Sequence, residues 1–503
     1  MYKEFLKNNK LFVFVALLVY AFTAFFSSGY HQADEHYQII EFANYLLGKT
    51  PQNVLAWEFN AQIRPSLQVY LASLLIYTFR AFGLENPYTI SFLIRLISAF
   101  FSLFAIISFY LALRKQKLFD AEHSKMYLYL AVFLWFIPYI AVRFSSETWS
   151  ADFFLLAVSY FLLNDSRKIR NNFFTGLLLA ISFIIRFQSI LLVVSFLFWA
   201  LFYLRKDVKC LIYITLAFVL IYLLSIVLDS VFYGNFTITA YNYFYENIIN
   251  GVAKKFGEEG LFFYISGIYK FSIVPLGLLF LVSLLFSFKH NYNKNLFVLL
   301  IVPYLLIHSV ISHKEMRFIF PLAFFVPYIT GDFISYLLNY RKTFIRKKYI
   351  KITLFILLFI NALALVIMGV KPAERGRMKI TEYIYNHYKN KKINLIFTDW
   401  SNPYNPWYHN RAVFYEQDSV KYTYIGNGDT LSLSVIDSSC VNLFVTNVSF
   451  YEKKQEYLHK LGFELKQKSI PDYVMFFNKF QKGLEPRFVL YLLEYKGDKY
   501  GKK

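Results

Sequence analysis

Five blocks of the sequence are long, apolar and nearly free of charge, and they constrain the fold more than any other feature. They span residues 11–28, 92–113, 211–228, 296–311 and 352–370. A helix of about 20 such residues crosses the hydrocarbon core of a bilayer and satisfies its own backbone hydrogen bonds. The chain as a whole is 57% hydrophobic, with a mean hydropathy of +0.41. The sequence therefore predicts an α-helical polytopic membrane protein.

The cations lie mainly in short loops between the apolar blocks. The net charge of +21 could suggest a nucleic-acid partner, but the cations form no stripe interleaved with stacking aromatic residues. Basic loops of this kind face the cytoplasm. They lie at residues 114–117, 167–170, 205–209, 289–294 and 341–351. This assignment places four segments outside, at residues 145–150, around 186, 229–264 and 313–317.

The alternation of basic loops predicts eleven spans, with the N-terminus inside and the C-terminus outside. It requires residues 65–82 to lie along the outer surface as a juxtamembrane helix. The alternative, that this segment crosses and another short one does not, remains open. Cys210 and Cys440 fall on opposite sides in this topology, so no disulfide is expected between them.

The composition changes near residue 371, which predicts a boundary between two domains. Residues 1–370 form the transmembrane domain, with a first outer loop at 30–64. Residues 371–503 are expected to form a small extracytoplasmic α/β domain. Its predicted strands are 393–398, 441–446 and 473–477, and its predicted helices are 374–388 and 451–461.

An acidic cluster opens the first outer loop, directly after the first apolar block. It contains His31, Asp34, Glu35, Gln38 and Glu41. A carboxylate at the mouth of a membrane cavity can take a proton from an acceptor hydroxyl, as a transferase requires. Acidic residues are also common in solvated loops. On spacing alone, the catalytic and the solvated interpretations both remain open.

A second cluster, on the same predicted face, contains His313, Lys314 and Arg317. Cationic side chains suit a departing phosphate, which needs charge neutralisation and hydrogen-bond donors. A basic loop that only sets topology would belong inside, so its outer position favours a function. Arg186 interrupts an apolar region, where an unpaired charge is costly. Arg186 and Glu147, taken singly, are also compatible with snorkelling or helix capping.

Four motifs resemble glycosyltransferase family 22, the mannosyltransferases of the GT-C superfamily. The resemblance is closest to the third mannosyltransferase of GPI-anchor assembly. The first loop is similar to the family's His-Pro-Asp-Glu signature and its Leu-x-Trp-Glu-Phe and Ile-Arg segments, and residues 312–321 match its Ser-His-Lys-Glu-x-Arg-Phe run. Residues 179–189 and 229–257 carry the other two motifs. One departure is that no proline precedes Asp34 and one extra residue follows His31.

The resemblance implies a GT-C fold and an inverting transfer of mannose, or a related hexose, from a polyprenyl-phosphate carrier to a hydroxyl of a lipid-linked glycan or glycolipid. Asp34 would be the general base, with Glu35 beside it. His313, Lys314, Arg317 and Arg186 would bind the donor phosphate. The residues expected to contact substrate are His31, Gln38, Glu41, Trp57, Arg64, Tyr233, Asn242 and Asn247. No cofactor and no divalent metal are expected, because Lys and Arg can neutralise the phosphate.

Two other classes of function remain as alternatives. A flippase of lipid-linked sugars would also carry polar groups near a membrane cavity, but such transporters often show paired repeats, which this sequence lacks. A non-catalytic scaffold would not need the complete set of Asp34, Arg64 and residues 313–317. The Lys, Asn, Ile, Phe and Tyr richness favours a bacterial inner membrane with a periplasmic site, or an ER membrane with a luminal site if the source is eukaryotic. A monomer with membrane lipids around it is expected, with no nucleic-acid partner.

Overall fold

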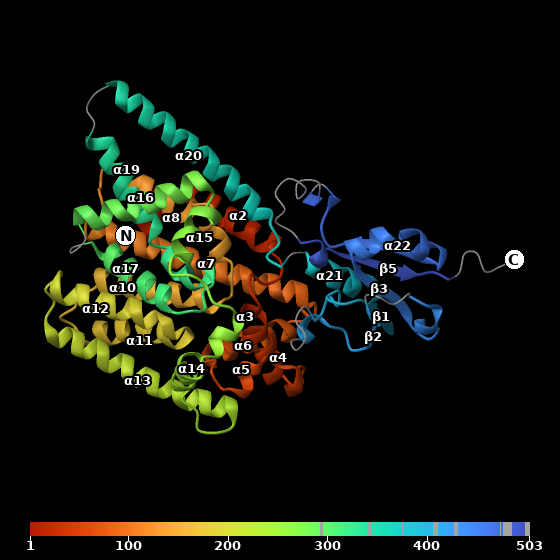
Figure 1. Cartoon of the computed structure of the whole chain (residues 1–503). Helices are drawn as coiled ribbons and strands as arrows, with labels where there is room; N and C mark the ends of the chain where they lie inside the picture. The colour runs from red at the N-terminus through yellow and green to blue at the C-terminus, as the bar shows by residue number, and fades with distance from the viewer. Residues whose placement is uncertain are drawn as a thin grey trace. The chain divides into compact units, whose positions relative to one another are not determined.

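The computed structural model describes residues 1–291, 295–340, 344–374, 376–405, 411–426, 431–472, 474–475 and 485–497. The chain divides into two compact units (Figure 1). Unit 1 comprises Met1–Ser27, Glu58–Tyr70 and Leu93–Lys371. Unit 2 comprises Ser28–Trp57, Leu71–Phe92 and Pro372–Lys503. The division at residue 371 coincides with the change in composition, but two earlier segments also belong to unit 2.

Unit 1 is built from helices. The elements that lie wholly or mainly in it are α1 (Tyr2–Asn8), α2 (Lys10–Phe26), α5 (Trp57–Asn60), α7 (Pro87–Lys115), α8 (Ser124–Phe133), α9 (Ile137–Ala141), α10 (Ser146–Leu163), α11 (Ile169–Ile185), η3 (Phe187–Ser189), α12 (Ile190–Phe202), α13 (Val208–Tyr233), α14 (Thr239–Phe244), η4 (Tyr245–Ile249), η5 (Val252–Phe256), α15 (Phe263–Phe271), α16 (Val274–Asn291), α17 (Leu296–Val310), η6 (Met316–Ile319), α18 (Phe320–Ala323), α19 (Val326–Tyr340) and α20 (Phe344–Val370).

All five apolar blocks of the sequence form helices: α2, α7, α13, α17 and α20. Within the described residues, Pro87–Lys115, Val208–Tyr233 and Lys348–Val370 are long and apolar enough to cross a membrane, and two bent helix pairs raise the number to five. Further apolar helices of 10–17 residues are shorter than a typical span. These lengths agree with a polytopic membrane protein, whereas the count of eleven spans stays a prediction.

The ends of the helices follow from local capping chemistry. The side chain of Asn295 accepts a hydrogen bond from the Phe297 amide and begins α17, and Asp207 caps α13 in the same way. Such caps satisfy amide groups that have no partner in the first helical turn. Gly234 ends α13 with a φ of 74°, a left-handed conformation that glycine adopts without a steric penalty.

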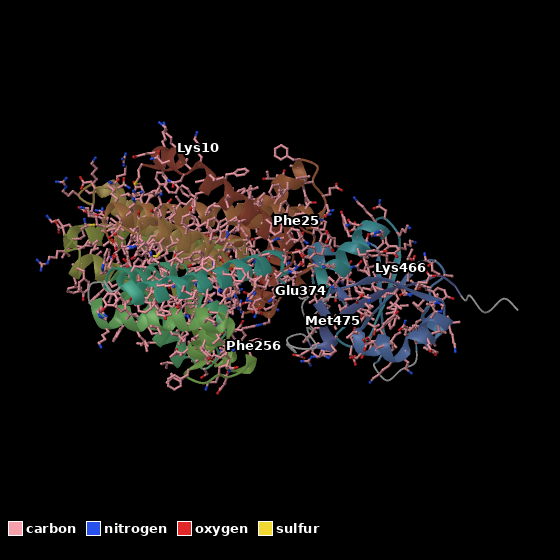
Figure 2. All side chains as sticks on the ribbon, turned by 90° about the horizontal axis from the view of Figure 1, so that it is seen from above. Lys10, Phe25, Phe256, Glu374, Lys466 and Met475 are labelled. Atoms are coloured by element: carbon pink, nitrogen blue, oxygen red, sulfur yellow. The ribbon has the colours of Figure 1, made fainter. Side chains whose placement is uncertain are left out.

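Unit 1 also holds polar contacts between its helices. The indole of Trp149 donates to Ser98 Oγ at 2.7 Å, and Ser102 Oγ donates to Asp152 Oδ2 at 2.5 Å. Figure 2 shows the side chains that fill the space between the ribbons, with Phe25 and Phe256 among the exposed aromatic residues. Exposed apolar side chains are expected where the solvent is lipid, and buried polar groups in such helices need partners.

Unit 2 contains a five-stranded sheet and short helices. Its elements are α3 (Ala33–Glu35), η1 (His36–Ile40), α4 (Glu41–Leu46), η2 (Gln52–Val54), most of α6 (Leu67–Ala81), α21 (Arg377–Tyr388), β1 (Ile393–Phe397), η7 (Val413–Tyr415), β2 (Val420–Tyr424), η8 (Leu433–Val435), β3 (Val441–Asn447), α22 (Val448–Lys460), β4 (Phe463–Lys468), η9 (Pro486–Phe488) and β5 (Leu490–Tyr495).

The strand order of the sheet is β2-β1-β3-β5-β4. β1 pairs in parallel with β2 and β3, and its Ile393 lies opposite both Val420 and Val441. β5 pairs antiparallel with β3 and β4. The small α/β domain predicted after residue 371 is therefore confirmed. Val474 and Met475, within the predicted strand 473–477, are helical, and the rest of that strand lies outside the described residues.

Unit 2 also joins the first outer loop to its C-terminal part. The backbone amide of Phe414 donates to Glu41 Oε1 at 2.9 Å, although 373 residues separate the two. His36 stacks on Tyr415 with ring centroids 5.2 Å apart, and the Tyr415 hydroxyl donates to Ser91 Oγ at 2.9 Å. These contacts explain why residues 28–57 belong to the same compact unit as the sheet.

Candidate functional site

The predicted catalytic carboxylates lie on α3, at the start of the first outer loop in unit 2. Asp34 is half-buried, and Glu35 is buried. The Glu35 carboxylate accepts a hydrogen bond from the backbone amide of His31 at 2.8 Å, which closes the turn that leads into α3. The acidic pair therefore sits on a folded turn rather than in an extended loop, and Glu35 helps to hold that turn.

Further along this loop, Gln38 and Glu41 are both buried. Glu41 Oε1 accepts from His36 Nε2 at 2.9 Å and from the Phe414 amide, and Glu41 Oε2 accepts from Thr50 Oγ1 at 2.7 Å. A carboxylate with this many internal donors contributes to the fold of the loop. Trp57 is half-buried at the start of α5. Substrate contact by these residues stays a prediction.

Residues 313–317 of unit 1, here called the basic turn, form part of a charged network rather than a set of isolated cations. The Arg317 guanidinium donates to both oxygens of Glu315, at 2.8 and 3.0 Å. Its Nη1 lies 3.5 Å from Glu147 Oε1, which also accepts from Arg186 Nη1 at 2.8 Å. Glu147 thus bridges two arginines that come from different elements. Arg186, Arg317 and Glu147 are all at least 90% buried.

His313 and Lys314 complete this turn. His313 Nε2 lies 3.1 Å from Glu315 Oε1, and Nδ1 lies 3.1 Å from the Gly257 carbonyl. The hydrogen bond to Glu315 raises the pKa of His313 above its usual value. Burial opposes ionisation of Glu315, but hydrogen bonds from His313 and Arg317 hold its pKa well below the usual range. Lys314 Nζ donates to the Glu259 carbonyl at 2.6 Å, so it fastens this turn to the 257–259 segment.

Three other residues expected to contact substrate lie in or beside the loop at residues 62–66: Arg64 belongs to the loop, and Tyr233 and Asn242 hydrogen bond to its backbone. The Tyr233 hydroxyl donates to the Arg64 carbonyl at 2.7 Å, and Asn242 Nδ2 donates to the Gln62 carbonyl at 3.2 Å. The Arg64 guanidinium lies 5.9 Å from the centre of the Tyr243 ring. These residues lie around the same loop, and Tyr233 and Asn242 direct their donors to backbone carbonyls; their contact with substrate stays a prediction.

Asn247 makes a more local contact, and Asp229 supplies a second anchor for the same loop. Asn247 Nδ2 donates to the carbonyl of Tyr243 within one helical turn. Asp229, at the end of α13, accepts from the Ser66 amide at 2.7 Å, from Ser66 Oγ at 2.6 Å and from Thr239 Oγ1 at 2.6 Å. The first part of the motif at residues 229–257 therefore positions the loop that carries Arg64.

Several residues near Arg186 escaped the sequence analysis. Tyr304 and His308, both on α17, stack with ring centroids 4.2 Å apart, and Tyr264 lies on α15. Each is buried and within electrostatic range of Arg186. They sit in apolar helices, where one polar atom leaves no pattern in the sequence. Glu147 was noted only as a helix-end residue because its partners lie far along the chain.

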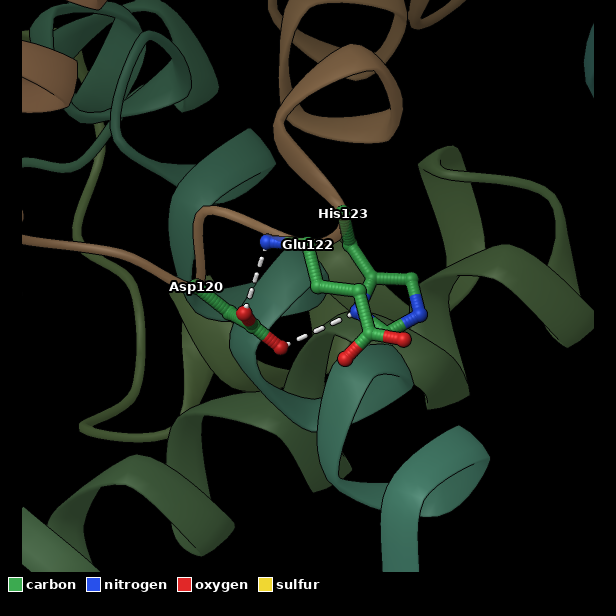
Figure 3. A group of neighbouring side chains, drawn as sticks. All are labelled: Asp120, Glu122 and His123. Carbon is green, nitrogen blue, oxygen red and sulfur yellow. Dashed lines mark hydrogen bonds and ion pairs between the residues drawn. The ribbon is translucent and has the colours of Figure 1, made fainter.

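One group of side chains in the described residues offers metal-ligand atoms within 4.8 Å of one another: Asp120, Glu122 and His123, between α7 and α8 (Figure 3). Asp120 Oδ2 already accepts from Ser335 Oγ at 2.5 Å and from His123 Nδ1 at 3.0 Å. These bonds, led by that from Ser335, lower the pKa of Asp120 to about 2. The carboxylate is occupied in joining this loop to α19, which gives the group a structural role.

Comparison of the chain with known proteins identifies the family to which it belongs. The model of the Alg9-like mannosyltransferase family matches residues 11–409. The chain belongs to that family. It is therefore a glycosyltransferase, and the sequence resemblance to glycosyltransferase family 22 is confirmed.

Individual relatives and solved structures agree. GPI mannosyltransferase 3 of Candida albicans is 27% identical over 409 residues, which cover 80% of this chain and 77% of that protein. GPI alpha-1,2-mannosyltransferase 3 of Bos taurus is 23% identical over 311 residues, and the match covers 56% of its length. The crystal structure of ArnT from Cupriavidus metallidurans bound to undecaprenyl phosphate aligns with a TM-score of 0.57 at 12% identity, covering 97% of this chain and 98% of ArnT. This similarity shows the GT-C fold.

Proposed function

We propose that this membrane glycosyltransferase transfers mannose from a polyprenyl-phosphate carrier to a hydroxyl of a lipid-linked glycan, with inversion, on the outer face of the membrane. The observation that carries the proposal is the buried network of Arg186, Glu147 and Arg317 in a member of this family. Cationic groups held away from water interact strongly with a phosphate.

The proposed reaction needs a base and a stabilised leaving group. The Asp34 carboxylate takes the proton of the acceptor hydroxyl as the hydroxyl oxygen attacks the anomeric carbon of mannose. The bond from that carbon to the phosphate oxygen breaks, and the lipid phosphate leaves with the electron pair. Arg186 and the residues of the basic turn neutralise the charge that develops on it. The undecaprenyl phosphate named with ArnT and the acceptors implied by the GPI enzymes support a lipid-phosphate donor and a glycolipid acceptor.

The acceptor and the donor can be identified with purified protein in detergent. The protein is incubated with labelled undecaprenyl- or dolichyl-phosphate mannose and a panel of cell-envelope glycolipids. We expect a mannosylated product, formed equally well with EDTA present because no divalent metal takes part. Transport has no meaning in detergent, so product formation also separates the enzyme from a flippase. A protein that yields no product with any pair would contradict the proposal.

Asp34→Asn tests the proposed base. The substitution keeps the size and polarity of the side chain but removes its ability to accept a proton at neutral pH. We expect transfer to fall by about 10²–10⁴-fold, with the donor still bound. Glu122→Gln, an exposed carboxylate in the α7–α8 loop, is the matched control and should retain full activity. Turnover like that of the wild type in Asp34→Asn would remove Asp34 from the mechanism.

A further inference from the structure

Arg186 carries buried donor nitrogens that are not fully satisfied by the described residues, although the Tyr304 hydroxyl lies close to its guanidinium. Its Nη1 donates to Glu147 and to Ser146 Oγ, but Nε and Nη2 have no hydrogen-bond partner of acceptable geometry among the described residues. A buried, charged donor without a partner is costly to a fold. Such an atom therefore needs an explanation, and a bound ligand is one that chemistry readily supplies.

His308 and Tyr264, which lie within electrostatic range of Arg186, also carry buried polar atoms without a partner of acceptable geometry among the described residues. Within the described part of the chain, these atoms are His308 Nε2 and the Tyr264 hydroxyl. His308 Nδ1 lies 2.9 Å from the Tyr304 carbonyl, and a carbonyl can only accept, so the proton belongs on Nδ1. His308 Nε2 is then a free acceptor. We call Arg186, Tyr264 and His308 the Arg186 cluster. Arg186 directly follows α11, Tyr264 lies on α15 and His308 lies on α17.

The chemistry of the unused atoms indicates the kind of ligand. The two guanidinium nitrogens, which together carry three N–H donors, suit an oxyanion such as a phosphate. A bare imidazole nitrogen cannot donate to a phosphate, but it can accept a hydrogen bond from a sugar hydroxyl, and a tyrosine hydroxyl can serve either group. By contrast, the Arg317 guanidinium already donates to both oxygens of Glu315. The Arg186 cluster therefore matches a phosphate joined to a sugar better than the basic turn does.

We propose that the Arg186 cluster binds the phosphosugar head group of the donor, with Arg186 on the phosphate and with His308 and Tyr264 as further binding residues. This inference rests on the proposed function, because it takes a lipid-phosphate sugar as the donor. It assigns ligand contacts to two side chains that lie in apolar helices and belong to none of the family motifs quoted above. Glu147 is then the carboxylate that orients Arg186, since it holds Nη1 and leaves Nε and Nη2 for the ligand.

Tyr264→Phe is the sharpest test, because it removes one oxygen atom that lies near the backbone of Glu315 and has no hydrogen-bond partner of acceptable geometry among the described residues. A substitution of this kind should leave the melting temperature of the ligand-free protein unchanged or slightly higher. The matched control is Tyr328→Phe. Tyr328 is equally buried, its hydroxyl also lacks a hydrogen-bond partner among the residues that the structure describes, and it stacks on Phe297 at the opposite end of α17 from His308.

The readout is the rise in melting temperature when each detergent-purified protein is titrated with undecaprenyl-phosphate mannose, undecaprenyl phosphate, inorganic phosphate or undecaprenol. Tyr264→Phe should raise the Kd for undecaprenyl-phosphate mannose about 3- to 10-fold, as expected for one lost hydrogen bond. His308→Phe, which keeps an aromatic ring against Tyr304, should weaken binding of the mannose conjugate more than binding of undecaprenyl phosphate. Tyr328→Phe should bind like the wild type, and undecaprenol should not discriminate among the proteins.

Two results would overturn the assignment. One is an unchanged Kd for the mannose conjugate in both Tyr264→Phe and His308→Phe. The other is a lower melting temperature of ligand-free Tyr264→Phe, which would mean that the hydroxyl already serves the fold. Both differ from failure of the proposed function, in which the wild type forms no product at all. A wild type that binds the donor without transferring mannose would leave the cluster standing.

Discussion

His313 and Glu315 are the residues of the basic turn whose pKa values are shifted from their usual range. The groups facing His313 are the Glu315 carboxylate, the Gly257 carbonyl and, at longer range, the Arg317 guanidinium. Because the first of these raises the pKa of His313 in the folded protein, folding favours the protonated imidazole. That contribution to stability is complete below the ordinary histidine pKa of about 6.5, and it is lost as the pH rises through the raised value.

We therefore expect His313→Gln to lower the melting temperature at pH 6 by about 1–2 °C and to have a smaller effect at pH 9. The expected change in melting temperature is modest because His313 is only partly buried, so water screens its interaction with Glu315. Glu315 has a depressed pKa, so it stays ionised across this window. His387→Gln, on an exposed face of α21, serves as the control. Melting curves of wild type and His313→Gln that stay parallel from pH 6 to pH 9 would contradict the pairing.

Single residues were predictable from sequence where a motif placed unlike charges close together. Arg317 was singled out because a basic group lay next to an apolar block where a basic loop was not expected, and Asp34 because it lies in a tight cluster of His, Asp, Glu and Gln; the catalytic role of Asp34 stays a prediction. Glu147 was not singled out as a member of a charged network, because its ion-pair partners Arg186 and Arg317 are distant in the sequence. His308 could not be identified from its neighbours at all, since a single imidazole in an apolar helix is compatible with a buried structural role.

At the scale of elements, the close approach of α11 and α13 depends on one glycine. A Cβ at Gly176 would lie 2.3 Å from the carbonyl oxygen of Ile214 and 2.8 Å from the Cβ of Ala217. The nearest atom belongs to the backbone of a neighbouring helix, so a side chain here forces the two helices apart. Small residues permit such contacts between membrane helices.

Gly176→Ala should therefore destabilise the protein by about 1–3 kcal/mol, the usual effect of an overpacked helix contact. Thermal unfolding in detergent measures the change. Gly260→Ala is the control, because a Cβ at Gly260 would meet no atom within 4 Å. Equal melting temperatures for the two variants would show that α11 and α13 have room for a methyl group.

The elements themselves were predicted unevenly, for a physical reason. Long apolar helices are recognisable because lipid requires about 20 apolar residues, and α13 and α20 meet that requirement. The edge strand β4 has the sequence FELKQK, whose charged residues hide its pairing with β5. Strand β2, at the other edge, is only partly buried and has the sequence VKYTY. Edge strands bury less apolar surface, so they carry weaker patterns. The strand β5, with the sequence LYLLEY, lies inside the sheet and was also not predicted, because a short apolar run does not by itself distinguish a strand from a helix.

At the scale of the whole molecule, the boundary at residue 371 was visible from composition, but the membership of residues 28–57 in unit 2 was not. The contacts that accompany this membership include a hydrogen bond from the Phe414 backbone amide to Glu41 and the stacking of His36 with Tyr415. The hydrogen bond from the Phe414 backbone amide to Glu41 joins residues 373 positions apart, and a backbone amide leaves no pattern in the sequence by which such a contact could be predicted. Residues 28–57 of the first outer loop are thus folded together with the C-terminal sheet within unit 2.

Glu41→Ala should loosen both partners of that contact together. The substitution leaves the Phe414 amide, Thr50 Oγ1 and His36 Nε2 without their common acceptor. We expect amide hydrogen exchange to become about tenfold faster at residues 36–50 and at residues 411–416, with α10 and α11 unaffected. Glu456→Ala, which removes an exposed carboxylate from α22, should change neither segment. Faster exchange confined to residues 36–50 would show that the C-terminal part holds its structure without the first outer loop, because a unit that folds through this contact must lose protection on both sides of it.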